Sequence, residues 1–583
     1  MAELNKGPAS SAQTFEIIIR KKAIYVDKTS YLANLLSDDN KVWFLARPHR
    51  FGKSLTVSTL KAVFSEEKRE LFKGLDIESR LSEARFAPRP VIHLDMSGPT
   101  DDDTLEVLKR TLGEMIIDIA ENQDITLDPT LPPKSLLAKL IKRSVKNSKR
   151  KVAILIDEYD SPLIAFKRRS EEEYDKLVES LRNFFKILKS LDEYISFIFI
   201  TGITRSLQFD LFSVLNTFSD ISANPQFGAM CGFTQEELED KFAHHIKRTA
   251  TTLKMSEKEL VTKMADYYNG FSFDGITRLY NPFSTLRFFQ DQIFSNYWFD
   301  TGTSILPLNL LKKQPLTVEA FRGLEVSADF PRIPGKLTPN NPVSFLYQTG
   351  YLALRPGAEA GEFTLDFPNH EVLTSMSILV VEDILGELAI SAVFQDTKKA
   401  LINGDAAALI KAFNQFFAKF PYDDYGAAKT KSEKKSNGEK EEEANEKKED
   451  VSDAEKITNR ESLFRSRLLS LLYCAIDLVF AEIHSSRGRS DIVAQSGKWT
   501  WVMELKVCLK KSEEQTTLNK ARTQMIEKRY AAGFENPICL GIVINNETRA
   551  IARWDNFGDL AKEYEAKQNR SPKKRLKSES PKD

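Results

Sequence analysis

The first 230 residues alternate between short aliphatic runs and segments with a helical period. Runs typical of buried strands lie at 41–45, 91–97 and 152–156, and within the segment YISFIFITGITR. A segment with a helical period, SLTVSTLKAVFSEE, follows the first of these runs. Strands that are apolar throughout are typical of parallel sheets covered on both faces, so the pattern predicts an α/β fold with a parallel sheet.

The middle of the chain has a helical pattern that gives way to a hairpin pattern. Residues Gly232 to Phe273 are amphipathic with a helical period, which suits a lid behind the sheet. Further on, FLYQTGYLAL, RPGAEAGE and FTLDFPN predict helix, strand, turn and strand, the order of a winged helix. A winged helix binds DNA or packs domains together, and the lack of clustered Lys and Arg favours packing here.

After residue 456 the pattern predicts a helix, ESLFRSRLLSLLYCAIDLVF, and then a β-hairpin. Strand propensity is high on both sides of Ser496–Gly497, which we take as the centre of the turn. Asp491 then lies opposite Val502, and Glu504 is its diagonal neighbour on the same face, about 7–8 Å away at Cα. Lys506 follows two residues later on that face.

Composition narrows the class of protein. The 583 residues are 42% apolar and 28% charged, as in an ordinary globular protein of several domains. Lys and Arg together number 83, as do Asp and Glu, which excludes a basic footprint for nucleic acid over the whole chain, so any such patch must be local. The four cysteines form no CxxC pair, which excludes a disulfide scaffold and a Cys-based zinc module and favours a reducing compartment. Neither a secretory signal nor a membrane-spanning run is visible, so we expect no membrane association.

Two segments of biased composition divide the chain. The stretch from Lys429 to Lys456 has almost no apolar side chains, so it predicts a flexible tether or, alternatively, a solvated helix. The end of the chain, from Lys567 to Asp583, is basic and predicts a disordered tail. The predicted parts are 14–230 for the sheet domain, 231–420 for the lid and hairpin region, 425–456 for the linker, 457–555 for the C-terminal domain and 566–583 for the tail.

The segment RPHRFGKS, between the first strand and its helix, contains half of a phosphate-binding loop. The backbone N–H groups at the helix start belong to Gly52, Lys53, Ser54 and Leu55. They would face an anion where the helix dipole favours negative charge. Lys53 can reach the outer phosphates of a nucleotide, and the Ser54 hydroxyl can bind Mg²⁺. Arg47 stands where the full motif has its first glycine, so the tripeptide alone also fits an ordinary helix start.

Polar residues end two of the predicted strands. Asp157 and Glu158 follow the run 152–156, at the edge where ligands bind in open α/β sheets. Asp157 would hold Mg²⁺ through water, and Glu158 would orient or deprotonate the attacking water. Thr201, at the end of another strand, can sense the γ-phosphate, and that segment alone also fits an ordinary strand end. These residues predict nucleotide binding; turnover stays open, because the sequence assigns no arginine finger.

The hairpin near the C-terminus presents a second candidate site. Asp491 and Glu504 can share a Mg²⁺ or Mn²⁺ ion, a hard cation that prefers oxygen ligands. Lys506 can orient or activate the attacking water and stabilise developing phosphate charge. Glu461, from the preceding helix, can supply a further ligand. A solvent-facing strand with alternating charges has the same pattern, so the hairpin alone leaves both interpretations open.

Several segments of the N-terminal part resemble the AAA-ATPase-like domain family. They include YVDKTSYLANLL, FLARPHRFGKSLTVSTLKAVF, ILIDEYDSPL, ITGITRSLQFDLFSVLN and MCGFTQEEL, and the resemblance covers about residues 14 to 372. That family has Arg-Pro-x-Arg-Phe-Gly-Lys-Ser in place of a full P-loop, which accommodates Arg47 and Arg50. The resemblance implies an ATP-binding domain in which Lys53 and Asp157 match the nucleotide motifs. It implies no particular substrate.

The C-terminal part resembles the PD-(D/E)XK nuclease superfamily over about residues 457 to 555. The segments SRGRSDIVAQSGKWTWVMELKV, KARTQMIEKRYAAGF and CLGIVINNETRAIARW carry this resemblance. The residues that match the superfamily's motifs are Asp491, Glu504 and Lys506 for its core, Glu461 for its early acidic residue, and Gln524 and Tyr530 for residues often found near the site. The resemblance implies metal-dependent cleavage of phosphodiester bonds, of DNA rather than RNA.

The combined interpretation is an ATPase-like domain that controls or positions a Mg²⁺-dependent nuclease acting on DNA. The alternative is a nucleotide-dependent regulator or scaffold whose nuclease fold binds nucleic acid or protein without cutting. We expect an intracellular protein. In a eukaryotic source the basic segment SPKKRLK would direct it to the nucleus, and otherwise it would be cytoplasmic.

Overall fold

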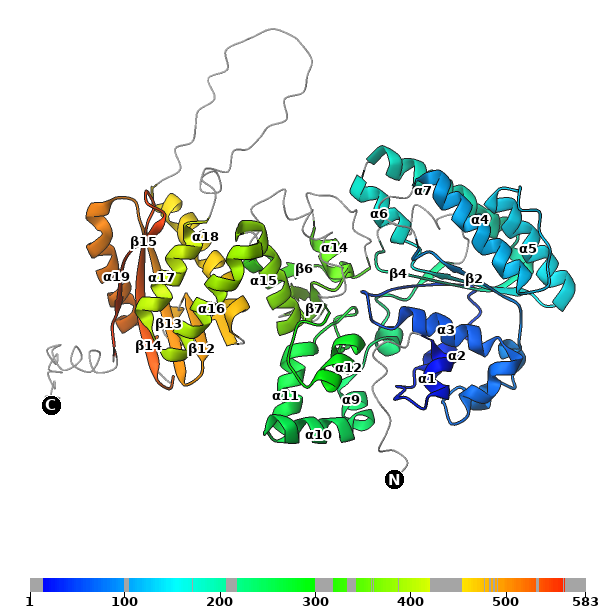
Figure 1. Cartoon of the computed structure of the whole chain (residues 1–583), viewed down its shortest axis with the longest axis horizontal. Helices are drawn as coiled ribbons and strands as arrows, with labels where there is room; N and C mark the ends of the chain where they lie inside the picture. The colour runs from blue at the N-terminus through cyan, green and yellow to red at the C-terminus, as the bar shows by residue number, and fades with distance from the viewer. Residues whose placement is uncertain are drawn as a thin grey trace, which may run out of the picture. The chain divides into compact units, whose positions relative to one another are not determined.

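The structure of the protein is a computed structural model of the whole chain (Figure 1). The residues it describes are 14–98, 104–169, 171–205, 218–298, 318–332, 342–357, 359, 361–385, 387–419, 453–476, 478–481, 484–485, 488–489, 491–530, 534–558 and 560. The predicted linker, 425–456, and the predicted tail, 566–583, lie outside the described residues except for the start of a helix at 453.

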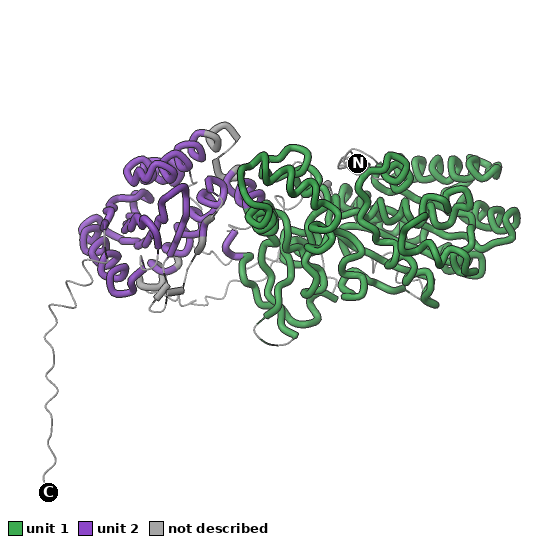
Figure 2. Tube along the Cα trace, turned by 90° about the horizontal axis from the view of Figure 1, so that it is seen from below, with its two compact units in different colours: residues 1–313, 321–373 green, residues 314–320, 374–583 purple. Residues whose placement is uncertain are grey.

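The chain forms two compact units (Figure 2). Unit 1 comprises residues 1–313 and 321–373, and unit 2 comprises residues 314–320 and 374–583. The division after residue 373 falls within the predicted lid and hairpin region, 231–420. The five predicted domain boundaries stay predictions, and each unit is described by itself.

A five-stranded sheet forms the centre of unit 1, in the order β2-β3-β4-β1-β5, with every neighbouring pair parallel. The strands are β1 (Val42–Ala46), β2 (Val91–Asp95), β3 (Val152–Asp157), β4 (Ile195–Gly202) and β5 (Phe218–Asp220). The predicted α/β class and the four predicted strands of this sheet are confirmed. Since all the strands run the same way, their carboxyl ends meet at one edge of the sheet.

Helices cover both faces of this sheet (Figure 1). On one face lie α4 (Leu105–Glu121), α5 (Pro133–Ser148), α6 (Ser161–Arg169) and α7 (Glu171–Ser190), and on the other lie α1 (Phe15–Arg20), α2 (Thr29–Ser37) and α3 (Lys53–Val63). Ile92, Ile154 and Ile198, from three neighbouring strands, share a buried core with α4, α5 and α7. Burial on both faces explains why these strands are aliphatic throughout.

The predicted helical lid of unit 1 is present as α9 (Gln235–Lys241), α10 (Ala243–Leu253) and α11 (Glu257–Tyr268), with α12 (Pro282–Asp291) packed on them. The predicted helix and hairpin also form, as α14 (Val343–Gln348), β7 (Ala353–Pro356) and β8 (Phe363–Asp366). A third strand, β6 (Leu324–Val326), adds to them in the order β6-β8-β7. The helix, strand, turn and strand predicted there are therefore confirmed.

Unit 2 contains a mixed five-stranded sheet in the order β15-β14-β13-β12-β9. Its strands are β9 (Leu478–Ala481), β12 (Ile492–Ser496), β13 (Trp499–Cys508), β14 (Pro537–Asn545) and β15 (Ala550–Asn556), and two short strands, β10 (His484–Ser485) and β11 (Gly488–Arg489), pair separately. Only β13 and β14 pair in parallel, and the other neighbours are antiparallel. The predicted hairpin is β12 and β13.

Helices before and after the predicted linker pack on this second sheet. They are α16 (Glu387–Asn403), α17 (Ala406–Phe417), α18 (Asp453–Ala475) and α19 (Glu514–Glu527). The helix α15 (His370–Leu385) contacts α18, where the Thr374 hydroxyl donates to the carbonyl of Tyr473 at 3.3 Å. Trp501 Nε1 donates to the carbonyl of Leu401 in α16, 3.1 Å away. In α17, the Asn414 amide oxygen accepts from the backbone N–H of Ile551 in the edge strand β15, at 2.8 Å. Helices that precede the linker thus pack on the second sheet. Sequence reasoning placed those helices in a different part of the chain from the sheet.

The predicted register of the hairpin is wrong: the turn lies one residue further along the chain, so each residue of β12 pairs two residues further along β13 than predicted. Ser496 pairs with Trp499 and Ile492 with Met503, so the turn is Gly497–Lys498 and Asp491 comes opposite Glu504. Gly497 has φ of 59° as the first of the two turn residues, the position where II′ turns favour glycine. The sequence pattern predicts glycine as the second turn residue, and the structure has it as the first. The two carboxylates stay on the same face, but as directly opposed neighbours.

Candidate functional site

The loop from β1 to α3 turns through two residues with left-handed backbone conformations. Arg50 has φ of 62° and Gly52 has φ of 101°. A Cβ built on Gly52 would meet no atom within 4 Å, so its backbone conformation, not steric crowding, favours glycine here in this structure. The turn places the first residues of α3 beside a cavity, as a phosphate-binding loop requires.

A cavity of about 660 Å³ lies over this loop at the carboxyl edge of the unit 1 sheet. Its lining contains the predicted residues Arg50, Gly52, Lys53, Ser54, Leu55, Asp157 and Glu158. Residues of the lid region and of α12, such as Phe233 and Phe283, line it too. The volume falls within the range of small-molecule sites, roughly 300–1,000 Å³. One cavity therefore gathers the whole predicted nucleotide set except Thr201.

Lys53 is buried and its ammonium group bonds to the loop itself. Nζ donates to the carbonyl of Arg47 at 3.0 Å and to that of Pro48 at 3.1 Å. These two carbonyls hold the charge at the inner end of the loop, where it also lowers the otherwise raised pKa of Glu158. A phosphate in the cavity would offer a stronger, charged acceptor to the same ammonium.

Arg47, which replaces the first glycine of the full motif, has a structural role. Its side chain is fully buried, and NH1 donates to the carbonyls of Ala46 at 2.9 Å and Ser222 at 2.7 Å. The guanidinium also lies 4.5 Å from the centre of the Phe273 ring. Burial lowers the pKa of Arg47, yet these carbonyls still favour its charge. The residue thus ties the loop to the segments after β5 and α11.

Asp157 and Thr201 are neighbours on adjacent strands, and the Thr201 hydroxyl donates to Asp157 Oδ1. The same carboxylate oxygen accepts from the backbone N–H of Glu158 at 3.1 Å. Thr201 therefore orients the Asp157 carboxylate through this hydrogen bond, although Thr201 itself does not line the cavity. Glu158, directly after β3, has φ of 49°, a left-handed backbone conformation that is uncommon for a residue other than glycine. Burial raises the pKa of Glu158, with further upward contributions from Asp157 and Asp160.

Sequence reasoning missed two further polar residues of this edge. Asp95, at the end of β2, is the register partner of Asp157 and lines the same cavity. His93 lines it as well, and its Nε2 atom is buried with no hydrogen-bond partner among the described residues. The available signal was the acidic end of VIHLD, which matches the acidic end of ILID one strand away in the sheet.

Arg205, which follows β4, links segments of unit 1 and does not line the cavity. Its Nε lies 2.7 Å from Asp220 Oδ2, and both side chains are largely buried. Its backbone N–H donates to the Gln348 side chain of α14 at 2.6 Å. The end of β4 is thereby connected to the helix and hairpin region that begins with α14.

In unit 2, Glu504 and Lys506 lie on the face of β13 that α19 covers. Glu504 is fully buried, and its Oε1 lies 2.9 Å from Lys506 Nζ. Burial and the charge of Asp491 raise the pKa of Glu504 to about 7. Burial disfavours the charge of Lys506, but the neighbouring carboxylates Glu504 and Glu461 outweigh this and raise its pKa. Lys506 therefore stays protonated and can stabilise negative charge.

Two other predicted residues surround this pair. Glu461, on α18, accepts from the backbone N–H of Val507 at 3.0 Å, and its second oxygen lies 4.0 Å from Lys506 Nζ. Asp491 accepts from the backbone N–H of Leu505 at 2.9 Å. Its other oxygen lies 3.3 Å from the guanidinium of Arg465, one turn after Glu461 on α18, a residue that sequence reasoning did not single out.

The donor set has the composition that a hard divalent cation prefers. Both carboxylate oxygens of Glu504 are buried without a hydrogen bond among the described residues, and Lys506 Nζ lies at ion-pair distance from Oε1 but not from Oε2. Such an atom is costly to bury unless a cation neutralises it. Within the described ranges no group of three or more His, Cys, Asp or Glu side chains already has the arrangement of a metal site. The side chains present therefore have the oxygen atoms that such an ion prefers. Asp491 and Glu461 each accept a hydrogen bond from a backbone N–H group in this structure.

Gln524 and Tyr530 meet at the end of α19. Gln524 Nε2 donates to the Tyr530 hydroxyl at 3.1 Å. Burial raises the pKa of Tyr530, and the charges of Glu504 and Asp491 raise it further, which shows how near the phenol is to the carboxylates. Both residues that the resemblance indicated are thus beside the site.

Comparison with known families assigns both regions. Residues 10–212 match the family described as predicted AAA-ATPase, and residues 459–554 match the PD-(D/E)XK nuclease superfamily. The chain therefore carries an AAA-ATPase-like domain followed by a C-terminal PD-(D/E)XK nuclease superfamily domain.

Similar proteins include the uncharacterized protein in the vnfD 5′ region of Azotobacter chroococcum, 27% identical over 544 residues that cover 90% of this chain and 94% of that protein. Among solved structures, the Aeropyrum pernix ORC2 protein in ADPNP–ADP complexes has a TM-score of 0.29 at 13% identity, over 61% of this chain and 92% of that one. The Aeropyrum pernix ORC1 protein in complex with DNA has a TM-score of 0.25 at 10% identity, over 62% and 94%. No helix in the described part of the chain is long and apolar enough to cross a membrane.

Proposed function

We propose that the protein binds and hydrolyses ATP in unit 1 and cleaves phosphodiester bonds of DNA in unit 2, with Mg²⁺ as the metal at both sites and Mn²⁺ as a substitute. The observation that carries this proposal is the buried Glu504 carboxylate, which has Lys506 on one oxygen and no donor on the other. A buried, half-paired carboxylate is costly unless a ligand completes it. The intact core motif Asp491, Glu504 and Lys506 supports cleavage over a degenerate fold.

In the ATP site, the backbone N–H groups at the start of α3 would bind the phosphates and Lys53 would neutralise their outer charge. Ser54 and Asp157 would hold Mg²⁺, which would neutralise part of the phosphate charge. Glu158 would accept a proton from the attacking water. Thr201 would keep Asp157 in place through their hydrogen bond, and Asp95 would add a further acceptor at the same edge.

In the nuclease site, Asp491, Glu504 and Glu461 would hold the metal, which when bound polarises a phosphoryl oxygen and lowers the pKa of its water. Lys506 is protonated, so it would orient the attacking water and stabilise the charge that develops on the phosphate. Gln524 and Tyr530, which already bond to each other, would order the polar wall beside the carboxylates.

The test is a cleavage assay with the full chain on supercoiled plasmid and on single-stranded DNA, with Mg²⁺ and with or without ATP, alongside phosphate release from ATP. Nicking or degradation that EDTA abolishes supports the nuclease, and release that Lys53→Ala abolishes supports the ATPase. A parallel assay on RNA of the same sequence tests the preference for DNA.

One observation favours the alternative of a nucleotide-dependent regulator or scaffold that binds without cutting. Among the described residues no metal-ligand group is formed, and Asp491 is paired with Arg465. In that case the full chain would bind nucleic acid or protein and change affinity with ATP, but it would cut nothing at any Mg²⁺ or Mn²⁺ concentration.

The proposed location is intracellular, and in a eukaryotic source the basic tail would direct nuclear import. The segment SPKKRLK, with Lys573, Lys574, Arg575 and Lys577, lies outside the described residues. Deletion of residues 571–583 from a fluorescent fusion should lower the nuclear fraction. An unchanged nuclear fraction would remove this assignment.

A further inference from the structure

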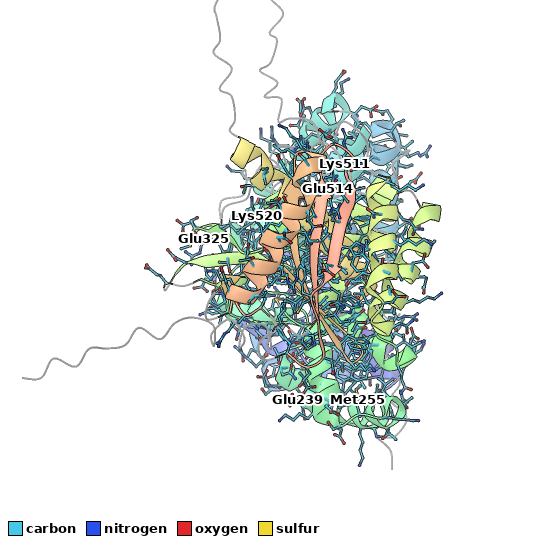
Figure 3. The ribbon with its side chains drawn as sticks, turned by 90° about the vertical axis from the view of Figure 1, so that its left-hand side faces the viewer. Glu239, Met255, Glu325, Lys511, Glu514 and Lys520 are labelled. Atoms are coloured by element: carbon cyan, nitrogen blue, oxygen red, sulfur yellow. The ribbon has the colours of Figure 1, made fainter. Side chains whose placement is uncertain are left out.

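The outer face of α19 and of the turn before it has an excess of positive charge. Six exposed cations lie between residues 510 and 529, all of which the structure describes: Lys510, Lys511, Lys520, Arg522, Lys528 and Arg529. The exposed carboxylate in the same stretch is Glu527. Figure 3 shows Lys511 and Lys520 along this helix and the turn before it. The chain as a whole is neutral, so this local excess is a distinct feature.

The helix that carries these cations is packed firmly against the unit 2 sheet. Its inner side buries Leu518 and Met525 against the core of the sheet. Near its start, Glu514 accepts from the Asn545 amide at 3.1 Å and lies 3.4 Å from Arg553. Removing lysines from the outer side should therefore leave the fold of unit 2 intact.

The basic face leads to the candidate metal site. At its C-terminal end, α19 supplies Gln524, which bonds to Tyr530 beside Glu504 and Asp491. Lys528 and Arg529 are exposed between those two residues in the chain. A nucleic-acid strand lying along α19 would consequently reach the carboxylates Glu504 and Asp491 near the C-terminal end of the helix.

The remaining exposed side chains of this stretch identify the chemistry of the ligand. They are Ser512, Gln515, Thr516, Asn519 and Thr523, which are uncharged hydrogen-bonding groups. No apolar side chain between residues 510 and 529 is exposed, so the face lacks the anchors that protein partners use. Cations interspersed with amides and hydroxyls are the groups that contact phosphate oxygens in DNA complexes.

We propose that this α19 face binds the sugar–phosphate backbone of DNA next to the bond that is cut. The inference rests on the proposed nuclease function and adds the surface that would position its substrate. A helix of this length spans about 20 Å, the length of roughly six phosphates along one strand. Its contacts set the position of the strand and carry no base preference.

The test is fluorescence anisotropy of a labelled 30-base-pair DNA with the full chain in EDTA, over a series of salt concentrations. The variant is Lys511→Ala/Lys520→Ala, and the matched control is Lys398→Ala/Lys399→Ala, two exposed lysines of α16 in the same unit. We expect the first variant to lower the salt slope of log K by about 2 and to weaken binding roughly tenfold at low salt. The control and Lys511→Arg/Lys520→Arg should bind as the parent does.

Equal binding by Lys511→Ala/Lys520→Ala and the parent would overturn the assignment of this face. If the parent still cuts DNA in that case, the proposed function stands and only the surface is wrong. A parent that neither binds nor cuts any nucleic acid would instead remove the proposed function, and this inference with it. Binding of an RNA duplex but not of DNA would overturn the choice of ligand.

Discussion

Lys506 Nζ lies 2.9 Å from one carboxylate oxygen of Glu504, while the other oxygen of that buried carboxylate has no donor among the described residues. Asp491 lies opposite Glu504 in the hairpin register, so a second carboxylate is adjacent to the half-paired one. A lysine that already neutralises part of this charge can stay in place when a cation binds on the other side. This relationship separates the expected roles of the three residues.

Asp491→Ala and Glu504→Ala should abolish DNA cleavage and weaken Mn²⁺ binding at least tenfold, because each removes a proposed ligand. Lys506→Ala should also lose cleavage but keep Mn²⁺ binding near the parent value, since a lysine is not a ligand. Mn²⁺ titration followed by electron paramagnetic resonance on the full chain gives the affinities. Parent-like Mn²⁺ affinity in Asp491→Ala would contradict its placement in the metal site. DNA affinity should change little in all three variants, because it comes mainly from cations on phosphates.

The contribution of Glu504 to the stability of the metal-free protein should be lost as pH rises from about 4.5 to about 7. The folded-state pKa of Glu504 is raised to about 7, so between its ordinary value and 7 the folded chain holds a proton that the unfolded chain has lost. Protonation therefore stabilises the fold below pH 7, and this contribution is lost as pH rises through 7. Melting temperatures of the parent and Glu504→Gln across this range test it. Parallel curves for the two proteins would be the contrary result.

Lys53→Ala should weaken ATP binding by roughly 1.5–3 kcal/mol, the usual contribution of hydrogen bonds to charged groups, which is about ten- to a hundredfold in Kd. Isothermal titration calorimetry measures it. Lys139→Ala, an exposed lysine of α5, is the control for loss of one charge. Equal ATP affinity in Lys53→Ala and the parent would show that the loop is not a phosphate site.

Glu158→Gln should keep ATP bound and stop its hydrolysis, since Asp157 still holds Mg²⁺ but the water loses its base. Because burial raises the pKa of Glu158, the parent rate should decline at a higher pH than for an ordinary glutamate as pH falls. Phosphate release measured from pH 5 to 8 follows both effects. Unchanged release in Glu158→Gln would exclude Glu158 as the base.

Gly404→Ala should destabilise unit 2, because Gly404 has φ of 72° and its added Cβ would lie 2.6 Å from the Trp499 ring. Strain and overpacking of this kind cost about 1–3 kcal/mol each. Gly558→Ala is the control, with φ of 63° but no atom near its Cβ. A melting temperature lowered in both variants by the same amount would show that α16 does not depend on contact with the sheet.

The sequence was sufficient to predict the ATPase-like sheet because each of its signals is local. Aliphatic runs predict the strands, Lys53 begins the helix that follows the first strand, and Asp157 ends another strand. The role of Arg47 could not be predicted, since its partners Ser222 and Phe273 are about 175 and 226 residues away in the chain. Asp95 was missed because only the sheet order, with β2 beside β3, brings it to Asp157.

The sequence predicts the hairpin of the unit 2 sheet, but it does not predict that helices before the linker pack on that sheet. Strand propensity predicts β12 and β13, but the register depends on the place of a single turn residue, Gly497, which is first in the turn and not second. The contact between Trp501 and Leu401 joins residues on either side of the predicted linker, and the charged composition of that linker carries no signal for it. An isolated fragment of residues 457–554 would expose Trp501, so the full chain is the proper material for every assay.

The most direct measurement is Mg²⁺-dependent cleavage of supercoiled plasmid by the full chain and by its Glu504→Gln variant, each with and without ATP. Glutamine keeps the size of the side chain but removes its charge, so the fold should persist while metal binding is lost. We predict nicking by the parent in Mg²⁺, none in EDTA, and none by Glu504→Gln in any condition. Cleavage by Glu504→Gln at the parent rate, or no cleavage and no Mn²⁺ binding by the parent, would contradict the account.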